Sequence, residues 1–209
     1  FQAMMTGVVT GDDNVAIGWK AGQDLTSAEG NVFVGRNAGA NTTTAGYGVA
    51  IGYEAGKMNV LKTNNVSVGG LANDQATNGQ SKIIIGYSAG RYANGNFSIG
   101  LGYETLKGAA DGSSTGTNNI ALGAYALYLA TTGAHNIAIG ANAGDVITTG
   151  SYNIALGQNS MGTSAGVTGS NNIAIGATAG TDITTALYTI SIGYEAGANI
   201  TTASDNVAI

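Results

Sequence analysis

The sequence predicts an all-β protein, a parallel β-solenoid (β-roll) of about twelve 17-residue coils that forms a single domain over residues 1–209. Three observations predict this fold: a nine-residue string that recurs along the chain, a constant spacing of its glycines, and an alternation of branched and small residues within it. The string reads NVAIGWKAG at residues 14–22, NIAIGANAG at 136–144 and NIAIGATAG at 172–180. Similarity at a fixed short period is typical of repeat architectures in which neighbouring units share one core.

The glycine that ends each apolar triplet defines the period, and we call it the anchor glycine. Seven of the ten spacings between successive anchors are 17 residues, and the others are 16, 21 and 19. The two long spacings place insertions after Gly102 and Gly157. The anchors are Gly18, Gly35, Gly52, Gly69, Gly86, Gly102, Gly123, Gly140, Gly157, Gly176 and Gly193.

The triplet before each anchor is predicted to be a β-strand. Its outer positions carry Val, Ile or Leu, and its middle position is small in most repeats, with Phe33 and Ile84 as exceptions. Side chains alternate between the two faces of a strand, so the branched residues share one face. We expect Val and Ile to fill the coil interior and the Ala/Ser face to pack against another copy of the chain. Runs such as ITTG at 147–150 predict a second short strand in each coil.

An asparagine column precedes the strands. Eight repeats carry Asn four residues before the anchor. Asn adopts the left-handed backbone conformation easily, so we expect a corner at this position. Stacked Asn side chains can also hydrogen-bond from one coil to the next. The predicted structural ladder comprises Asn14, Asn31, Asn65, Asn119, Asn136, Asn153, Asn172 and Asn206.

Composition argues against several classes of function. The net charge is −5, and only 9% of residues are charged, so no basic stripe is available for nucleic acid. No apolar run approaches the roughly 18 residues of a membrane helix, so we expect no membrane insertion. The chain has no Cys, and its one imidazole, His135, is expected at an exposed corner. One His per chain excludes a His-based triad or a multi-His metal site within it.

Paired carboxylates are the remaining route to catalysis. Glu54, Glu104 and Glu195 share one position in the repeat, but the nearest two are three coils apart. Three coils correspond to roughly 14 Å, beyond the roughly 5–9.5 Å between the carboxylates of a glycosidase. Asp145 and Asp182 are two coils apart. We therefore expect no enzyme, no catalytic residues, no metal and no cofactor; a tailspike-like enzyme is a weaker alternative.

Three surface features are candidate sites. The residue after the anchor is aromatic in five repeats, and these rings either cover the coil edge or stack on sugar rings of a receptor. Threonine columns suggest ice binding more weakly, because Leu61, Asn78 and Asn94 interrupt them. Four N-x-[ST] sequons are candidate glycosylation sites. The aromatic residues are Trp19, Tyr53, Tyr87, Tyr103 and Tyr194, and the sequons begin at Asn41, Asn65, Asn96 and Asn199.

The strings NVAIGWKAG, NIAIGANAG and NIALGQNSM resemble the head repeats of YadA-like trimeric autotransporter adhesins, and similar arrays occur in phage tail fibres. The resemblance implies a trimeric, extracellular fibre segment at a cell surface or on a virion, one that supplies length, rigidity and surface attachment. It implies that the chain's partners are its own copies, as a homotrimer or by axial stacking, and a host-surface glycan or protein receptor. The 17-residue period is longer than the usual adhesin head repeat.

Overall fold

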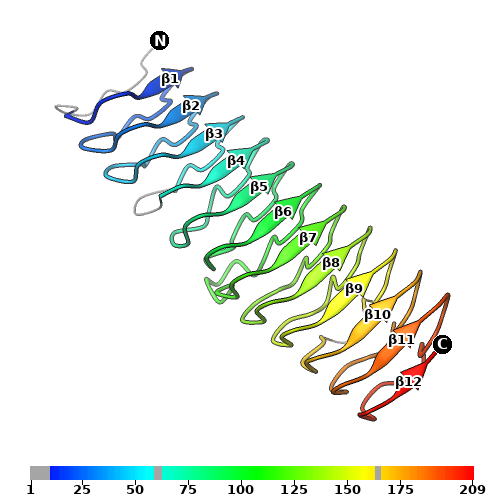
Figure 1. The fold of residues 1–209 in the computed structure, drawn as a ribbon. Coiled ribbons are helices and arrows are strands. Elements are labelled where there is room, and N and C mark those ends of the chain that lie inside the picture. The colour runs from blue at the N-terminus through cyan, green and yellow to red at the C-terminus, as the bar shows by residue number, and fades with distance from the viewer. Residues whose placement is uncertain (1–9, 59–62, 163–165) are drawn as a thin grey trace.

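The computed structural model describes residues 10–58, 63–162 and 166–209, and these residues form one parallel β-solenoid (Figure 1). The coils stack in sequence order into a rod, and the two termini lie at its opposite ends (Figure 1). All twelve strands belong to one sheet, in which each strand neighbours those before and after it in sequence. The predicted all-β solenoid is confirmed.

Each coil contributes one short strand, located at the predicted triplet. The strands are β1 (Val15–Ile17), β2 (Val32–Val34), β3 (Val49–Ile51), β4 (Val66–Val68), β5 (Ile83–Ile85), β6 (Ile99–Leu101), β7 (Ile120–Leu122), β8 (Ile137–Ile139), β9 (Ile154–Leu156), β10 (Ile173–Ile175), β11 (Ile190–Ile192) and β12 (Val207–Ala208).

Equivalent residues of successive repeats lie beside one another. Ile137 pairs with Ile154 across a regular 17-residue spacing. Ile99 pairs with Ile120 across the 21-residue spacing, and Ile154 pairs with Ile173 across the 19-residue one. The register survives both insertions, so the additional residues are accommodated in the connections outside the sheet.

The expected second strand is wrong. Within the described residues, the Thr-containing runs form bends, with a single bridge between Ile147 and Val167. The backbone N–H groups of Thr131 and Gly133 both donate to the carbonyl of Thr148, at 3.0 Å each. The chain therefore curls around one acceptor in the next coil instead of using successive acceptors along an extended strand.

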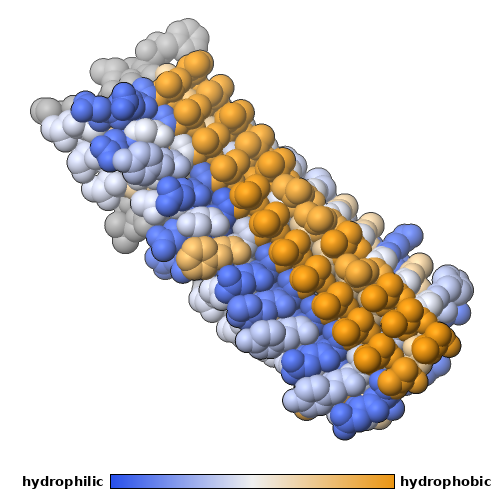
Figure 2. Space-filling model, viewed as in Figure 1, coloured by the Kyte–Doolittle hydropathy of each residue, from blue (hydrophilic) through white to orange (hydrophobic). Residues whose placement is uncertain are grey.

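The faces of the strands are the reverse of the expected ones. The middle residue points into the coil, so Ala138 is completely buried. The branched residues point outward, and 46% of Val15 and 41% of Ile139 are exposed. These side chains form a continuous apolar stripe along the rod, which Figure 2 shows in orange. We call it the Val/Ile stripe: the first and third residues of each three-residue strand, which are Val, Ile or, in β6, β7 and β9, Leu at the third position.

The coil interior is too thin to hold two branched residues per strand. Gly144, four residues after its anchor, lies so close to Ile147 that an added Cβ would be 2.7 Å from Ile147 Cδ1. One coil earlier the same two positions hold Leu127 and Ala130, with the large and small residues exchanged. Each such pair supplies one large apolar side chain to a coil that Ala otherwise fills, which leaves no interior space for the stripe.

The corner before the strand also differs from the expectation by one residue. Positive φ angles occur at the residue preceding the ladder position, as in His135 (φ 59°) and Tyr152 (φ 59°), and not at Asn136 or Asn153. The Asn instead continues the backbone pairing of the strand that follows: Asn153 O accepts a hydrogen bond from Ile137 N at 2.9 Å.

Candidate functional site

The asparagine column joins the coils through their backbones. Asn136 Nδ2 donates to Gly150 O at 2.8 Å, and Asn136 Oδ1 accepts from the backbone N–H of Asn153 at 2.9 Å. Asn119, Asn153 and Asn172 repeat this pattern, and all of them are buried. Each side chain thereby satisfies one donor and one acceptor that burial would otherwise leave unpaired. The arrangement is mainly side chain to backbone, with direct Asn–Asn bonds such as Asn31 Nδ2 to Asn14 Oδ1 (3.0 Å) as an addition.

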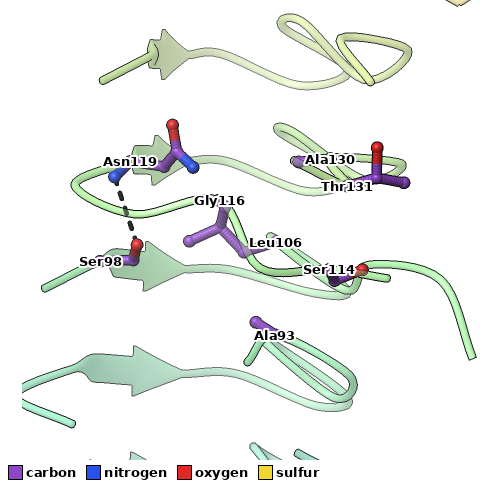
Figure 3. A pocket seen from close by; sticks show the side chains of 8 residues that line it. All are labelled: Ala93, Ser98, Leu106, Ser114, Gly116, Asn119, Ala130 and Thr131. Atoms are coloured by element: carbon purple, nitrogen blue, oxygen red, sulfur yellow. Dashed lines mark hydrogen bonds between the residues drawn. The ribbon is translucent and has the colours of Figure 1, made fainter. Parts of the chain in front are cut away.

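One interruption of this column creates an internal void. Ser98 occupies the ladder position, and its Oγ accepts a hydrogen bond from Asn119 N at 3.2 Å (Figure 3). The Ser side chain is too short to supply the hydrogen bond that Nδ2 of an Asn donates to a backbone carbonyl. Beside it lies a cavity of about 10 Å³, lined by residues that include Leu106, Gly116 and Ala130 (Figure 3). A space of this size holds at most a single water molecule, so it is a packing defect and no ligand site.

Replacing Ser98 with Asn should stabilise the protein. Gly116 occupies the same repeat position as Gly133, whose carbonyl oxygen accepts a hydrogen bond from Asn119 Nδ2. The Nδ2 of the new Asn would therefore have the Gly116 carbonyl within reach, and its side chain would fill the void. We expect a gain of about 1 kcal/mol, typical of one added buried hydrogen bond. Thermal unfolding followed by circular dichroism measures it. The reciprocal change Asn136→Ser should lower stability; equal midpoints for both variants and the parent protein would contradict the role of the ladder.

The aromatic residues after the anchors fall into separate groups. Tyr87 and Tyr103 stack with their ring centroids 5.7 Å apart, and Tyr103 meets Tyr125 edge to face at 5.3 Å. Trp19 and Tyr53 lie two coils apart, on either side of Arg36. Tyr194 is 74% exposed, five repeats beyond Tyr103. The five predicted rings therefore do not form one continuous receptor surface.

The guanidinium of Arg36 is held between two rings. Its Cζ lies 4.9 Å from the ring centroid of Trp19 and 5.8 Å from that of Tyr53. Lys20 Nζ lies 4.7 Å from the same Trp19 ring. Trp19, Lys20 and Arg36 border a surface hollow of about 310 Å³, which Lys57 and Asn41 also line. At this predicted aromatic position, cations and a hollow therefore occur together.

Two of the candidate carboxylates are engaged by lysines. Glu54 and Glu104 each form an ion pair with the Lys three residues later, at 3.2 and 3.1 Å. Burial raises the pKa of Asp145 to about 6, and its backbone hydrogen bonds oppose that shift. In the part of the chain that the structure describes, no three His, Cys, Asp or Glu residues gather into a metal-binding group.

The sequon asparagines differ in accessibility. Asn65 is buried in the ladder, with Nδ2 donating to Gly79 O at 3.0 Å. Asn41 Nδ2 donates to Met58 Sδ, and Asn96 Oδ1 accepts from the backbone N–H of Gln80. Asn199 is exposed. Glycosylation at Asn65 would require the ladder to open locally.

Sequence reasoning missed the cations of this site. Trp19, Arg36 and Tyr53 occupy the same position in three successive repeats, so the order aromatic, cation, aromatic is visible once the repeats are aligned. Lys20 occupies the next repeat position, and Lys57 lies four positions further along its own repeat than Tyr53. The signal was present in the 17-residue spacing but not in any local motif.

Comparison of this chain with protein-family models, with curated proteins and with solved structures finds no match. Among the described residues, no helix has the length and apolar character needed to cross a membrane.

Proposed function

We propose that this chain is a structural segment of an extracellular fibre, of the adhesin or tail-fibre kind, in which three parallel copies associate through their Val/Ile stripes. The observation that carries this proposal is the stripe itself, which runs along the rod without a break (Figure 2). Sheet faces exposed to water normally carry polar side chains, and extended apolar patches mark contact surfaces.

The stripe suits a copy of the same chain. Each three-residue strand presents two aliphatic side chains of similar shape, Val, Ile or Leu, at the spacing fixed by the sheet. A second copy lying parallel to the first therefore meets a matching pair at every level, which unrelated surfaces do not offer. Cyclic symmetry closes such contacts into a finite assembly. The resemblance of the repeats to trimeric adhesin heads favours three copies.

Association also accounts for a core made largely of Ala and Gly. A coil with so little interior buries few large side chains by itself, with Leu127 and Ile147 among them. Burying the stripe between copies adds apolar area at about 25 cal/mol per Å². In this proposal the trimer supplies the hydrophobic stabilisation that the thin coils lack, and the result is a stiff rod.

The Ile139→Lys variant tests the assembly. Three-fold symmetry would bring three ammonium groups together in an apolar interface, where unpaired charge is strongly unfavourable. We expect sedimentation equilibrium to give three times the chain mass of 20.6 kDa for the parent protein and the monomer mass for the variant. Circular dichroism at low temperature should report β-structure in both, because Ile139 points away from the coil interior. The midpoint of thermal unfolding should be lower for the variant, which lacks the stabilisation that the trimer supplies.

The control is Thr149→Lys, which adds the same charge at an exposed bend outside the stripe and should leave the trimer intact. A monomeric parent protein would refute the proposal, and a dimer would refute the three-fold arrangement. Ala138→Lys is not a suitable test, because Ala138 is buried inside the coil and the substitution should disrupt the solenoid itself.

A further inference from the structure

Three of the seven Lys and Arg residues of this acidic chain meet at one hollow near the start of the described solenoid. The hollow has a volume of about 310 Å³, and Trp19, Lys20, Arg36, Asn37, Asn41 and Lys57 line it. None of its lining residues is acidic, although the chain as a whole carries a net charge of −5. The hollow is therefore a local concentration of positive charge on an otherwise acidic rod, which favours an anionic ligand.

The arginine is oriented for such a ligand. Trp19 and Tyr53 lie 4.9 and 5.8 Å from Arg36 Cζ, and stacking on rings restrains the guanidinium. A stacked guanidinium keeps the N–H groups at its edge available, and their fork matches the two oxygens of a carboxylate or sulfate. Arg36 contacts these rings and forms no ion pair with any acidic group that the structure describes.

The other lining groups add charge and neutral hydrogen-bonding capacity. Lys20 lies beside Trp19, whereas Lys57 shares its charge with Glu54 at 3.2 Å. Asn37 and Asn41 each commit one amide N–H, to Glu54 Oε1 and Met58 Sδ respectively. An amide oxygen can accept hydrogen bonds from hydroxyl groups. A free inorganic anion would use the cations alone, but a sugar that carries an anionic group would use cations and amides together.

We propose that this hollow binds an acidic sugar at the end of a glycan, with the carboxylate or sulfate of that sugar on Arg36 and its hydroxyl groups on the neighbouring amides. The volume fits a small ligand, at the lower end of the range for small-molecule sites. A long polyanion fits poorly, because the other described cations do not extend the site: Lys82 is buried, and Arg91 and Lys107 pair with Asp74 and Glu104.

The site does not depend on the proposed trimer. None of the lining residues belongs to a strand, so none belongs to the Val/Ile stripe. Association through the stripe repeats the hollow once per copy, and several weak sites on one rod reinforce binding to a surface that carries many copies of the sugar.

The single tryptophan of the chain is in this hollow, so the whole protein reports on its own site. The experiment is a titration with glucuronic acid, glucose 6-sulfate and glucose, followed by Trp19 fluorescence and by calorimetry. Glucuronic acid or glucose 6-sulfate should change the fluorescence to saturation, and the stronger of the two identifies the anionic group. Glucose, which lacks the anion, should produce no saturable change.

Two variants decide the role of the arginine. Arg36→Lys keeps the charge but loses the fork, and calorimetry should show acidic-sugar binding weakened by roughly ten-fold or more. Lys107→Gln removes a cation that also lies over a tyrosine and pairs with a glutamate, and should leave binding unchanged. Equal responses to glucose and glucuronic acid, unchanged affinity in Arg36→Lys, or no binding of either acidic sugar would overturn the proposal. The chain mass in solution, measured in parallel, keeps this result separate from that of the trimer.

Discussion

The free energy of unfolding should rise between pH 7 and pH 10, and the Lys82→Met variant should lose most of this rise. Lys82 occupies a ladder position and is completely buried. Its Nζ donates to Asn73 Oδ1 at 2.8 Å and to Ala93 O at 2.5 Å, both uncharged acceptors. Burial without a counter-charge lowers the pKa of Lys82 to about 7.

The direction follows from proton binding. In the unfolded chain the lysine keeps its ordinary pKa of about 10.4 and stays protonated where the folded protein has released the proton. Because the unfolded state binds more protons in this window, stability increases with pH through it, and the penalty is fully present below pH 7. At ~1.36 kcal/mol per pKa unit the change is on the order of 3–5 kcal/mol.

Urea unfolding at several pH values between 6 and 10 measures this slope. The methionine keeps the length of the side chain, so Lys82→Met should be more stable than the parent protein at pH 6 and should show a flat profile. Lys107→Met is the control, since Tyr128 and Glu104 overcome the effect of burial and hold the pKa of Lys107 above its ordinary value, outside the window. If the free energy of unfolding of the parent protein does not change between pH 7 and pH 10, burial does not lower the pKa of Lys82 and the prediction is wrong.

Lys82 also shows how the core adapts when a repeat departs from the pattern. Its coil has Ala93 where other coils have Ile147 or Ile183, and Lys82 Nζ reaches the carbonyl oxygen of Ala93. The same coil has Ile84 in the middle of its strand instead of Ala. The side-chain volume that is missing at Ala93 is thus supplied by Lys82 and Ile84 of the same coil.

Much of the fold was predictable because backbone geometry alone determines it. The anchor spacing predicted the period, the strands and their parallel order, and pairs such as Ile137 with Ile154 follow directly from it. The side that faces the interior was not predictable from alternation, because alternation separates two faces of a strand without saying which one encloses the core. The exchange of large and small residues between Gly144–Ile147 and Leu127–Ala130 is the sequence signal that identifies the interior.

The candidate site was predictable only in part, for a related reason. Trp19 and Tyr53 were identified because the residue after the anchor is aromatic in five repeats, whereas the role of Arg36 depends on its position between these two rings. In a solenoid, contacts that build a site run along the rod between equivalent repeat positions. A search for local motifs along the chain does not detect them, but an alignment of the repeats does.

Gly140→Ala should be among the most damaging single substitutions in the described coils. Gly140 has φ 132°, a backbone conformation that residues with a Cβ rarely adopt. An added Cβ would also lie 2.6 Å from Gly157 O and 2.7 Å from Gly157 C in the next coil. Backbone atoms cannot move aside without breaking the sheet, so we expect a loss of about 3 kcal/mol or more in the free energy of unfolding.

Two other glycines separate the causes of this loss. Gly112 has φ 82° but no atom within 4 Å of its added Cβ, so Gly112→Ala should show the conformational cost alone, about 1 kcal/mol. Gly70 has no positive φ, and its nearest contact would be Tyr87 Cδ2 at 3.4 Å, so Gly70→Ala should be nearly neutral.

The position of the damage distinguishes the solenoid from an ordinary globular fold. Each coil contacts its two neighbours only, so stability is close to a sum of local terms. Hydrogen exchange in the Gly140→Ala variant should therefore lose protection in the coils around β8 and β9, while β2 and β3 keep theirs. Uniform loss along the rod would mean that the coils unfold as one unit, and that the anchor glycines act on the whole array instead of on the contact between one coil and the next.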